Sequence, residues 1–484
     1  MVDYAVLFDT INNLANILKN WISSKTLINI IASNSADGII ASTIISDIIF
    51  QLEGRFHLKF LDEIYEDWIN DYLKMFNKKF EQCYYVFLDC GNDSIHYLTK
   101  YFPKKRLMIL DHTNLPENFD NNDSDLYCLD LESLNIDGNK EISTSAICYY
   151  ILKELVKNNR EIDKNLILKD YLILSIVGAL GDHQDTGKKH SLLGINNLIF
   201  EECKNNKYII DEENLRFFRR NGPIIESISE TIEPYLINLT NNIDNVRKLL
   251  LKLGIPTKIS IDKLDKKMKT ELNSTLIEYI YDYKDLAGIN YIIQEDSYTG
   301  YLKDAREFSI ILNSCGFLKH SDIGFELCLG NRGSLLKNAI NLYKKFREMI
   351  PIYLDWISTP DNILETRYIQ CILGNKNFNN KILEYTILLG KKLHILRDDK
   401  LISEIVYDSK NEKIFKIIYI PDKFINKNIN FYNIIKETNN NFEINSEIFY
   451  NQNEKYRCKI IDDLEIKSYL NKLNSFIDKH FIKE

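Results

Sequence analysis

Apolar runs of strand length alternate with helical stretches through the first 195 residues, and this alternation constrains the fold more than any other feature. Parallel strands need a crossover connection, usually a helix, so this order is typical of a parallel sheet covered by helices. We therefore predict an α/β fold with a doubly wound parallel sheet. The strand-like runs are LINIIAS, RFHLKFL, YYVFLD, RLMILD and DLYCLD, and the clearest helix is DGIIASTIISDIIFQL.

Three of these runs end at a turn that contains an aspartate. Asp37 follows the first run in the sequence SNSADG, Asp89 ends the third run, and Asp111 ends the fourth. A further aspartate, Asp182, lies in GALGDHQD beside glycines that permit a tight turn. Sites in open α/β sheets form outside the carboxyl ends of the strands, so we expect these aspartates to converge there.

Length and composition set broad limits on the class of protein. A chain of 484 residues exceeds one ordinary core, so we expect two or three domains. We find no leader peptide and no apolar run long enough to span a bilayer, and we expect a cytoplasmic protein without a membrane partner. The nine cysteines form no CxxC pair, which favours buried thiols over a zinc site. A net charge of −8 still permits a local basic groove for nucleic acid.

From about residue 196 the sequence becomes more charged and its pattern more helical. We predict three parts: a parallel-sheet domain at 1–195, a helical connecting region at 196–345, and a smaller α+β domain at 346–484. Within 301–334, several glycines predict strands separated by turns. In the last part, LISEIVYD and KIFKIIYI predict a hairpin, and the Asn-rich stretch from 425 to 447 predicts a loop with short strands.

The aspartates, together with His112, are the ligand types that Mn²⁺ or Mg²⁺ accepts. Two such ions about 3.5 to 4 Å apart clamp the attacking and leaving oxygens of a phosphodiester displacement, which makes phosphoester hydrolysis one hypothesis. The alternative is structural, because an aspartate that follows a strand is also a preferred N-cap of the next helix.

The motifs SADG, FLDCG, LDHT and GALGD occur in the order of the four motifs of the DHH phosphoesterase superfamily, which the chain resembles. The segment LKDAREFSIILNSCGFLKHSDIGFELCLGNR resembles archaeal RecJ-like, GINS-associated proteins. This resemblance implies that the first part is a RecJ-like DHH domain and the last part a DHH-associated domain. It also implies that Asp37, Asp89, His112 and Asp182 are metal ligands, and that Asp111 orients them. For His183, next to Asp182, the alternatives are that it orients the ligands too or that it is merely exposed.

Departures from the family motifs are as informative as the matches. An active first motif usually reads His-x-Asp-Ala-Asp-Gly, so Ser33 and Ser35 replace two expected ligands. The third motif, usually Asp-His-His, ends in Thr113 instead of a second histidine. No glycine follows residue 425, where the family has a substrate-binding Gly-Gly-His motif, and Phe317 stands in place of a usual basic residue.

Two main hypotheses follow. The first is a RecJ-like replication protein that resembles the helicase subunit joining MCM and GINS, binds GINS and single-stranded DNA, and has weak or no nuclease activity. The second is an active Mn²⁺-dependent exonuclease on single-stranded DNA or RNA. A small-molecule phosphoesterase is a third possibility. The cofactor is Mn²⁺ or Mg²⁺, if any.

Basic clusters near aromatic residues are a candidate path for a nucleic-acid strand. They are Lys188 and Lys189 after the fourth motif, and Arg219 and Arg220 next to the Phe217–Phe218 pair. Proteins that bind single strands combine a positive groove with aromatic stacking platforms. For any one cluster, the alternative is an ordinary solvated helix face.

Overall fold

The computed structural model describes residues 4–64, 66–75, 81–116, 119, 126–157, 164–219, 222–407, 412–427, 429–444, 448–451, 455–460 and 465–482. The chain forms two compact units, Met1–Arg347 and Glu348–Glu484. The three-part division at residues 195 and 345 stays a prediction. None of the described helices combines the length and the apolar character that crossing a bilayer requires.

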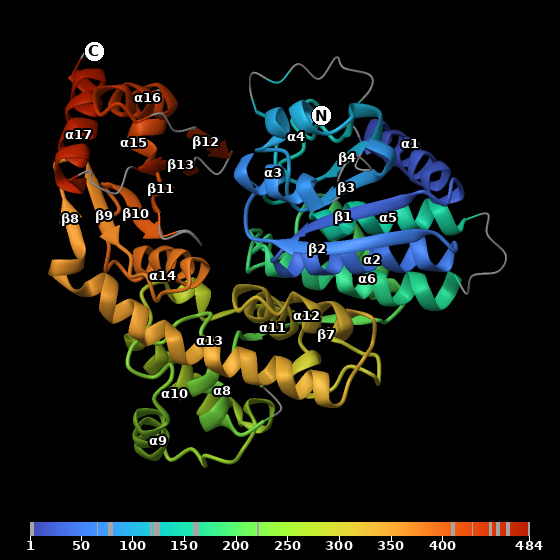
Figure 1. Ribbon diagram of the computed structural model, residues 1–484. Helices are drawn as coiled ribbons and strands as arrows, with labels where there is room; N and C mark the ends of the chain where they lie inside the picture. Colours follow the sequence, from blue (N-terminus) through green and yellow to red (C-terminus); the bar gives the residue numbers. More distant parts are fainter. Residues whose placement is uncertain are drawn as a thin grey trace. The chain divides into compact units, whose positions relative to one another are not determined.

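The first unit is built around a five-stranded sheet of order β2-β1-β3-β4-β5, in which every pairing is parallel. Its strands are β1 (Leu27–Ser33), β2 (Arg55–Leu61), β3 (Tyr84–Leu88), β4 (Leu107–Leu110) and β5 (Tyr127–Cys128). Its helices begin with α1 (Tyr4–Ser23), α2 (Ala36–Gln51), α3 (Glu66–Met75), α4 (Ile95–Tyr101), α5 (Thr144–Val156), α6 (Lys164–Gly181) and α7 (Gly194–Asn205). The predicted parallel α/β fold is confirmed (Figure 1).

Helices cover both faces of this sheet because alternate strand residues point to opposite sides. Tyr85 and Phe87 of β3 share a core with Tyr72 of α3 and Leu98 of α4. On the other face, α2 lies against β1 and β3 and is covered in turn by α5 and α6 (Figure 1). Almost every side chain of α2 is therefore buried, including those of its first turn.

The first unit continues beyond the sheet as helices and one β-ribbon. Strands β6 (Ile209–Leu215) and β7 (Ala287–Ile293) pair antiparallel. The helices are α8 (Ile224–Glu230), α9 (Ile243–Lys252), α10 (Lys266–Leu276), α11 (Ala305–Phe317) and α12 (Ser321–Cys328). Helix α13 (Ser334–Ser358) begins in the first unit and ends in the second. Apolar side chains of α8, α9 and α10 form a separate core with Leu215 and Leu286.

The strands predicted within residues 301–334 are wrong, because this segment contains α11 and α12. Two of its glycines lie inside these helices for reasons of packing. A Cβ at Gly316 would lie 1.6 Å from the carbonyl oxygen of Asn34, and one at Gly324 would lie 3.1 Å from the side chain of Ile39. Here glycine permits a close approach to the β1–α2 turn and does not mark a loop.

The second unit contains a mixed six-stranded sheet of order β12-β13-β11-β10-β9-β8, and its described residues form four α-helices after α13. The strands are β8 (Ile363–Glu365), β9 (Ile369–Leu373), β10 (Leu401–Tyr407), β11 (Lys413–Tyr419), β12 (Ile448–Asn451) and β13 (Lys455–Ile460). The helices are α14 (Asn380–Lys392), α15 (Asp422–Ile425), α16 (Phe431–Asn441) and α17 (Ile466–Ile482). The predicted hairpin is confirmed, because β10 and β11 pair antiparallel.

The loop predicted for the Asn-rich stretch is wrong over its described central part. Phe431–Asn441 forms α16, because Phe431, Ile434, Ile435 and Thr438 lie at helical spacing and are buried. Residues 428 and 445–447 of this stretch lie outside the described residues.

Candidate metal centre

Asp37 lies in the first turn of α2 without capping that helix. The N-cap is Ser35, whose hydroxyl accepts a hydrogen bond from the N–H of Gly38 at 2.9 Å. The buried carboxylate of Asp37 accepts bonds from the backbone N–H groups of Thr144 (2.6 Å) and Ser145 (3.0 Å). These groups begin α5, and the N-terminus of a helix favours a negative charge. The N-cap alternative therefore does not hold for Asp37.

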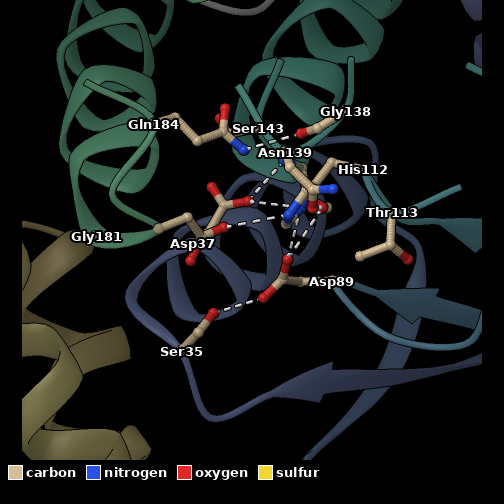
Figure 2. A network of polar contacts seen from close by, with 12 residues as sticks. Ser35, Asp37, Asp89, His112, Thr113, Gly138, Asn139, Ser143, Gly181 and Gln184 are labelled. Carbon is tan, nitrogen blue, oxygen red and sulfur yellow. Dashed lines mark hydrogen bonds and ion pairs between the residues drawn. The ribbon is translucent and has the colours of Figure 1, made fainter. Parts of the chain in front are cut away.

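Asp89 follows β3 in a left-handed backbone conformation, with φ of +57°, which is uncommon outside glycine. The hydroxyls of Ser33 and Ser35 both donate to its Oδ2 at 2.5 Å. The hydroxyl of Thr144 donates to the other oxygen, Oδ1, at 3.2 Å. Figure 2 shows that Ser35 reaches Asp89 from the side opposite to His112. The Oδ2 atom of Asp89 is thus occupied by the two serines that replace expected ligands.

His112, two residues after β4, lies between the aspartates. Its Nδ1 is 3.1 Å from Oδ1 of Asp89 and 3.8 Å from Oδ2 of Asp37. Its Nε2 is 3.8 Å from Oδ2 of Asp182. Nδ1 therefore faces Asp37 and Asp89, as Figure 2 shows, and Nε2 faces Asp182.

Asp182 comes directly after the last residue of α6. Its Oδ2 atom is buried and has no hydrogen-bond donor among the described residues. A buried carboxylate oxygen without a donor is costly, unless a cation compensates it. Gly178, one turn earlier, leaves room for the cluster, since a Cβ there would lie 2.4 Å from the carboxylate of Asp37.

One ligand atom from each of Asp37, Asp89, His112 and Asp182 lies within 4.8 Å of the others. Burial, with repulsion from Asp89, raises the pKa of Asp37 to about 6. Burial, with repulsion from Asp89 and Asp37, also raises the pKa of Asp182 well above its usual value. Burial opposes a charge on His112, but Asp89 and Asp182 outweigh it and raise the pKa of His112 to about 10. A protonated His112 thus balances part of the negative charge.

The donor set fits one divalent ion. Three carboxylates and one imidazole are ligands that Mn²⁺ accepts, and the donor-free oxygen of Asp182 faces the cluster. Among the described residues a second ion has no equivalent set of ligands, and Oδ2 of Asp89 already accepts bonds from two hydroxyls. The residues present therefore fit a one-ion site better than a two-ion site.

The two residues expected to orient the ligands lie differently. Asp111 is buried and accepts bonds from the N–H and hydroxyl of Thr113, both at 3.0 Å, and from the N–H of Asn92 at 3.1 Å. It therefore fixes the loop that carries His112. His183 is half exposed, and its Nδ1 is 3.6 Å from a carboxylate oxygen of Glu233. It shares a turn with Asp182 but contacts a different group.

Two of the expected strand-binding residues form ion pairs with glutamates. Lys188 and Lys189 are exposed, and Lys189 pairs with Glu213 at 2.7 Å. Arg219 forms an ion pair with Glu226. Arg220 lies outside the described residues.

The prediction that aromatic rings beside these arginines stack on bases is wrong. Phe217 and Phe218 have 0% and 2% of their surfaces exposed, so neither can stack on a base. Both rings contribute to the packed interior of the first unit.

Several residues that build the site were not expected from the sequence. Thr144 and Ser145 hold Asp37, and the sequence signal for them was the polar run STS before an apolar helix. Gln184 bonds to the carbonyl of Gly138 at 3.1 Å, and Gly138 packs against the carbonyl of His112 (Figure 2). No local pattern indicates Gln184, because its partner lies 46 residues earlier.

Comparison of the sequence with known proteins finds a relative of undescribed activity. The chain is 25% identical over 341 residues to an uncharacterized protein of Methanocaldococcus jannaschii, covering 67% of this chain and 72% of that protein. No family model matches the chain.

Comparison of the fold is more informative. CDC45 from Entamoeba histolytica matches with a TM-score of 0.64 at 12% identity, covering 98% of this chain and 99% of that one. Exonuclease RecJ bound to manganese matches with a TM-score of 0.51 at 10% identity, covering 99% and 95%. The DHH domain of a protein described as a member of a family of ribosomal proteins matches with a TM-score of 0.54 at 12% identity, covering 100% and 93%.

These structural matches show that the chain has the RecJ-like DHH fold, as the motifs predicted. Within that class, the chain matches CDC45 over almost the full length of both proteins.

Proposed function

We propose that this chain is a cytoplasmic RecJ-like replication protein that works by binding rather than by cutting. In this proposal it binds single-stranded DNA and GINS as a component of the replicative helicase, with MCM as its other partner. Its nuclease activity is weak or absent, and its site holds at most one Mn²⁺ or Mg²⁺ ion. The fold supports the proposal, since CDC45 matches over the whole chain.

The observation that carries the proposal is that the hydroxyls of Ser33 and Ser35 both donate hydrogen bonds to the carboxylate of Asp89. Two-metal hydrolysis requires carboxylates that are free to bind two adjacent ions. Here one carboxylate oxygen accepts both hydroxyls at 2.5 Å. A neutral hydroxyl at Ser35 does not offset the charge of a second ion as the expected aspartate would, and a hydroxyl at Ser33 is a weaker ligand than the expected imidazole. The bonds therefore favour a stable fold without a complete two-metal centre.

A second candidate, an active Mn²⁺-dependent single-strand exonuclease, has one observation in its favour. Asp182 keeps a buried oxygen without a donor among the described residues, directed at three other ligands. A bound ion would supply Lewis-acid chemistry at that point. The two candidates differ in whether one ion suffices for turnover.

A nuclease assay on the full chain with Mn²⁺ and labelled single strands separates them. We expect no robust cleavage, together with binding of single strands and co-elution with GINS. Robust cleavage that Asp89→Ala abolishes would refute the binding proposal, provided the variant is folded by circular dichroism.

A gain-of-function variant sharpens the test. Ser33→His, Ser35→Asp and Thr113→His together restore the family ligands, and we expect this triple variant to bind a second Mn²⁺ ion and to gain cleavage. Ser23→His with Ser24→Asp, at exposed positions where α1 ends, is the matched control and should gain neither. If the triple variant binds two ions and stays inactive, loss of ligands is not the reason for inactivity.

A further inference from the structure

Helix α11 contacts both turns that deliver aspartates to the ion site. Asn313 has 8% of its surface exposed. Its side-chain oxygen accepts a bond from the N–H of Ala36 at 2.7 Å, and its side-chain nitrogen donates to the carbonyl of Gly181 at 3.0 Å. Ala36 precedes Asp37 and Gly181 precedes Asp182. One amide therefore bridges two turns that lie far apart in the chain.

Helices α11 and α12 also contact the turn before Asp37 at Asn34. A Cβ at Gly316 would lie 1.6 Å from the carbonyl oxygen of Asn34, so α11 packs directly on the backbone of this turn. The hydroxyl of Ser321, at the start of α12, donates to the side-chain oxygen of Asn34 at 2.5 Å. Across the bridge, a Cβ at Gly181 would lie 2.6 Å from the Cβ of Ala36. The two turns and α11 thus form one packed unit.

The two aspartates depend on this bridge unequally. Asp37 is held independently, because two N–H groups of α5 donate to its carboxylate. The Oδ2 atom of Asp182 has no hydrogen-bond donor among the described residues, and Nε2 of His112, 3.8 Å away, is beyond hydrogen-bond distance. The position of Asp182 therefore depends on its backbone, which Asn313 holds through the carbonyl of Gly181.

We infer that Asn313 is a positioning residue for the ion site, fixing Asp182 against Asp37 through the bridge between their turns. This inference rests on the one-ion site of the proposed function. It gives α11 a role in metal binding, although no residue of α11 is a ligand.

Mn²⁺ binding to the full chain, measured by titration calorimetry and by the electron paramagnetic resonance of the bound ion, tests the inference. We expect Asn313→Ala to weaken binding by about 10 to 100-fold, the loss typical when a group that orients a ligand is removed. The control is Ser314→Ala, because Ser314 is also buried on α11 but bonds only to the carbonyl of Ile310 at 2.7 Å. It should change affinity by less than about twofold.

Asn313→Asp provides a second variant of the same shape if Asn313→Ala does not fold. It keeps an acceptor for Ala36 and loses the donor to Gly181, so we expect an altered resonance spectrum and weaker binding than in the wild type. Equal affinity in the wild type and both Asn313 variants overturns the inference. No Mn²⁺ binding by the wild type also overturns it, while the DNA-binding proposal stands. Two bound ions with cleavage overturn that proposal, and the Asn313 comparison still decides the inference.

Discussion

Binding of Mn²⁺ should depend steeply on pH, because the ion competes with a proton held by the cluster. His112 lies between Asp89 and Asp182, which raise its pKa to about 10. A metal ligand must be neutral imidazole, so each ion that binds through His112 displaces at least one proton below that pH. Affinity therefore falls as the pH falls.

The magnitude follows from this one-proton exchange. Loss of one proton per ion makes the logarithm of the association constant rise by about one per pH unit. Between about pH 6.5 and about pH 8.5 the affinity should therefore increase by about 100-fold, or about 2.7 kcal/mol. Asp182, whose pKa burial and the neighbouring aspartates raise well above its usual value, and Asp37, whose pKa is raised to about 6, take up further protons toward lower pH, so about 100-fold is a lower bound. The slope should steepen there.

Calorimetry in two buffers of different ionisation enthalpy measures the protons released for each Mn²⁺ bound. The control is His57→Gln, because His57 is an exposed residue of β2 that lies outside the ligand cluster. We expect His57→Gln to keep the wild-type slope and His112→Gln to lower it, since the glutamine side chain carries no proton for the ion to displace. A wild-type slope near zero over the whole range contradicts the proton competition.

Three further results are expected. Gly178→Ala should lower the free energy of unfolding by about 1 to 3 kcal/mol in urea titration, because the new Cβ would lie 2.2 Å from the Ser145 hydroxyl; unchanged stability would mean that α6 can shift. Ser35→Ala should cost about 0.5 to 2 kcal/mol in thermal unfolding through loss of the α2 cap, and a stabilised variant would contradict that role. If single-stranded DNA follows the exposed lysines, Lys188→Ala should reduce the salt dependence of binding by a slope of about one in fluorescence anisotropy, and an unchanged slope places the strand elsewhere.

The sheet and the convergence of the acids were predictable from the sequence for a physical reason. Alternating strands and helices require a parallel sheet, and the carboxyl ends of parallel strands meet at one edge. Asp37, Asp89 and His112 follow three such strands, and their ligand atoms meet. Knowledge of the local pattern was sufficient, because each residue's position depends on the element directly before it.

The contacts that hold the acids were not predictable in this way. Thr144 and Ser145 bond to Asp37 across more than 100 residues, and Asn313 reaches Ala36 across 277. The glycine pattern also gave a wrong prediction in α11, because Gly316 permits a close contact with the backbone of Asn34 and does not form a turn. In each case the role of the residue depends on a neighbour that is distant in the sequence, and the periodicity of the sequence does not reveal that neighbour.

The retention of Asp89 and His112 does not by itself favour a working nuclease. Buried carboxylates raise the pKa of His112 to about 10, and Asp89 accepts bonds from His112, Ser33 and Ser35. Removing Asp89 would leave His112 with only the more distant carboxylates of Asp37 and Asp182, both 3.8 Å away. Asp89 therefore stabilises the fold even without an ion. Replacement of the usual first-motif ligands by serines gives Asp89 neutral donors, so the site can lose metal chemistry and keep its acids. This is why the gain-of-function variant, rather than Asp89→Ala alone, distinguishes a structural cluster from a catalytic one.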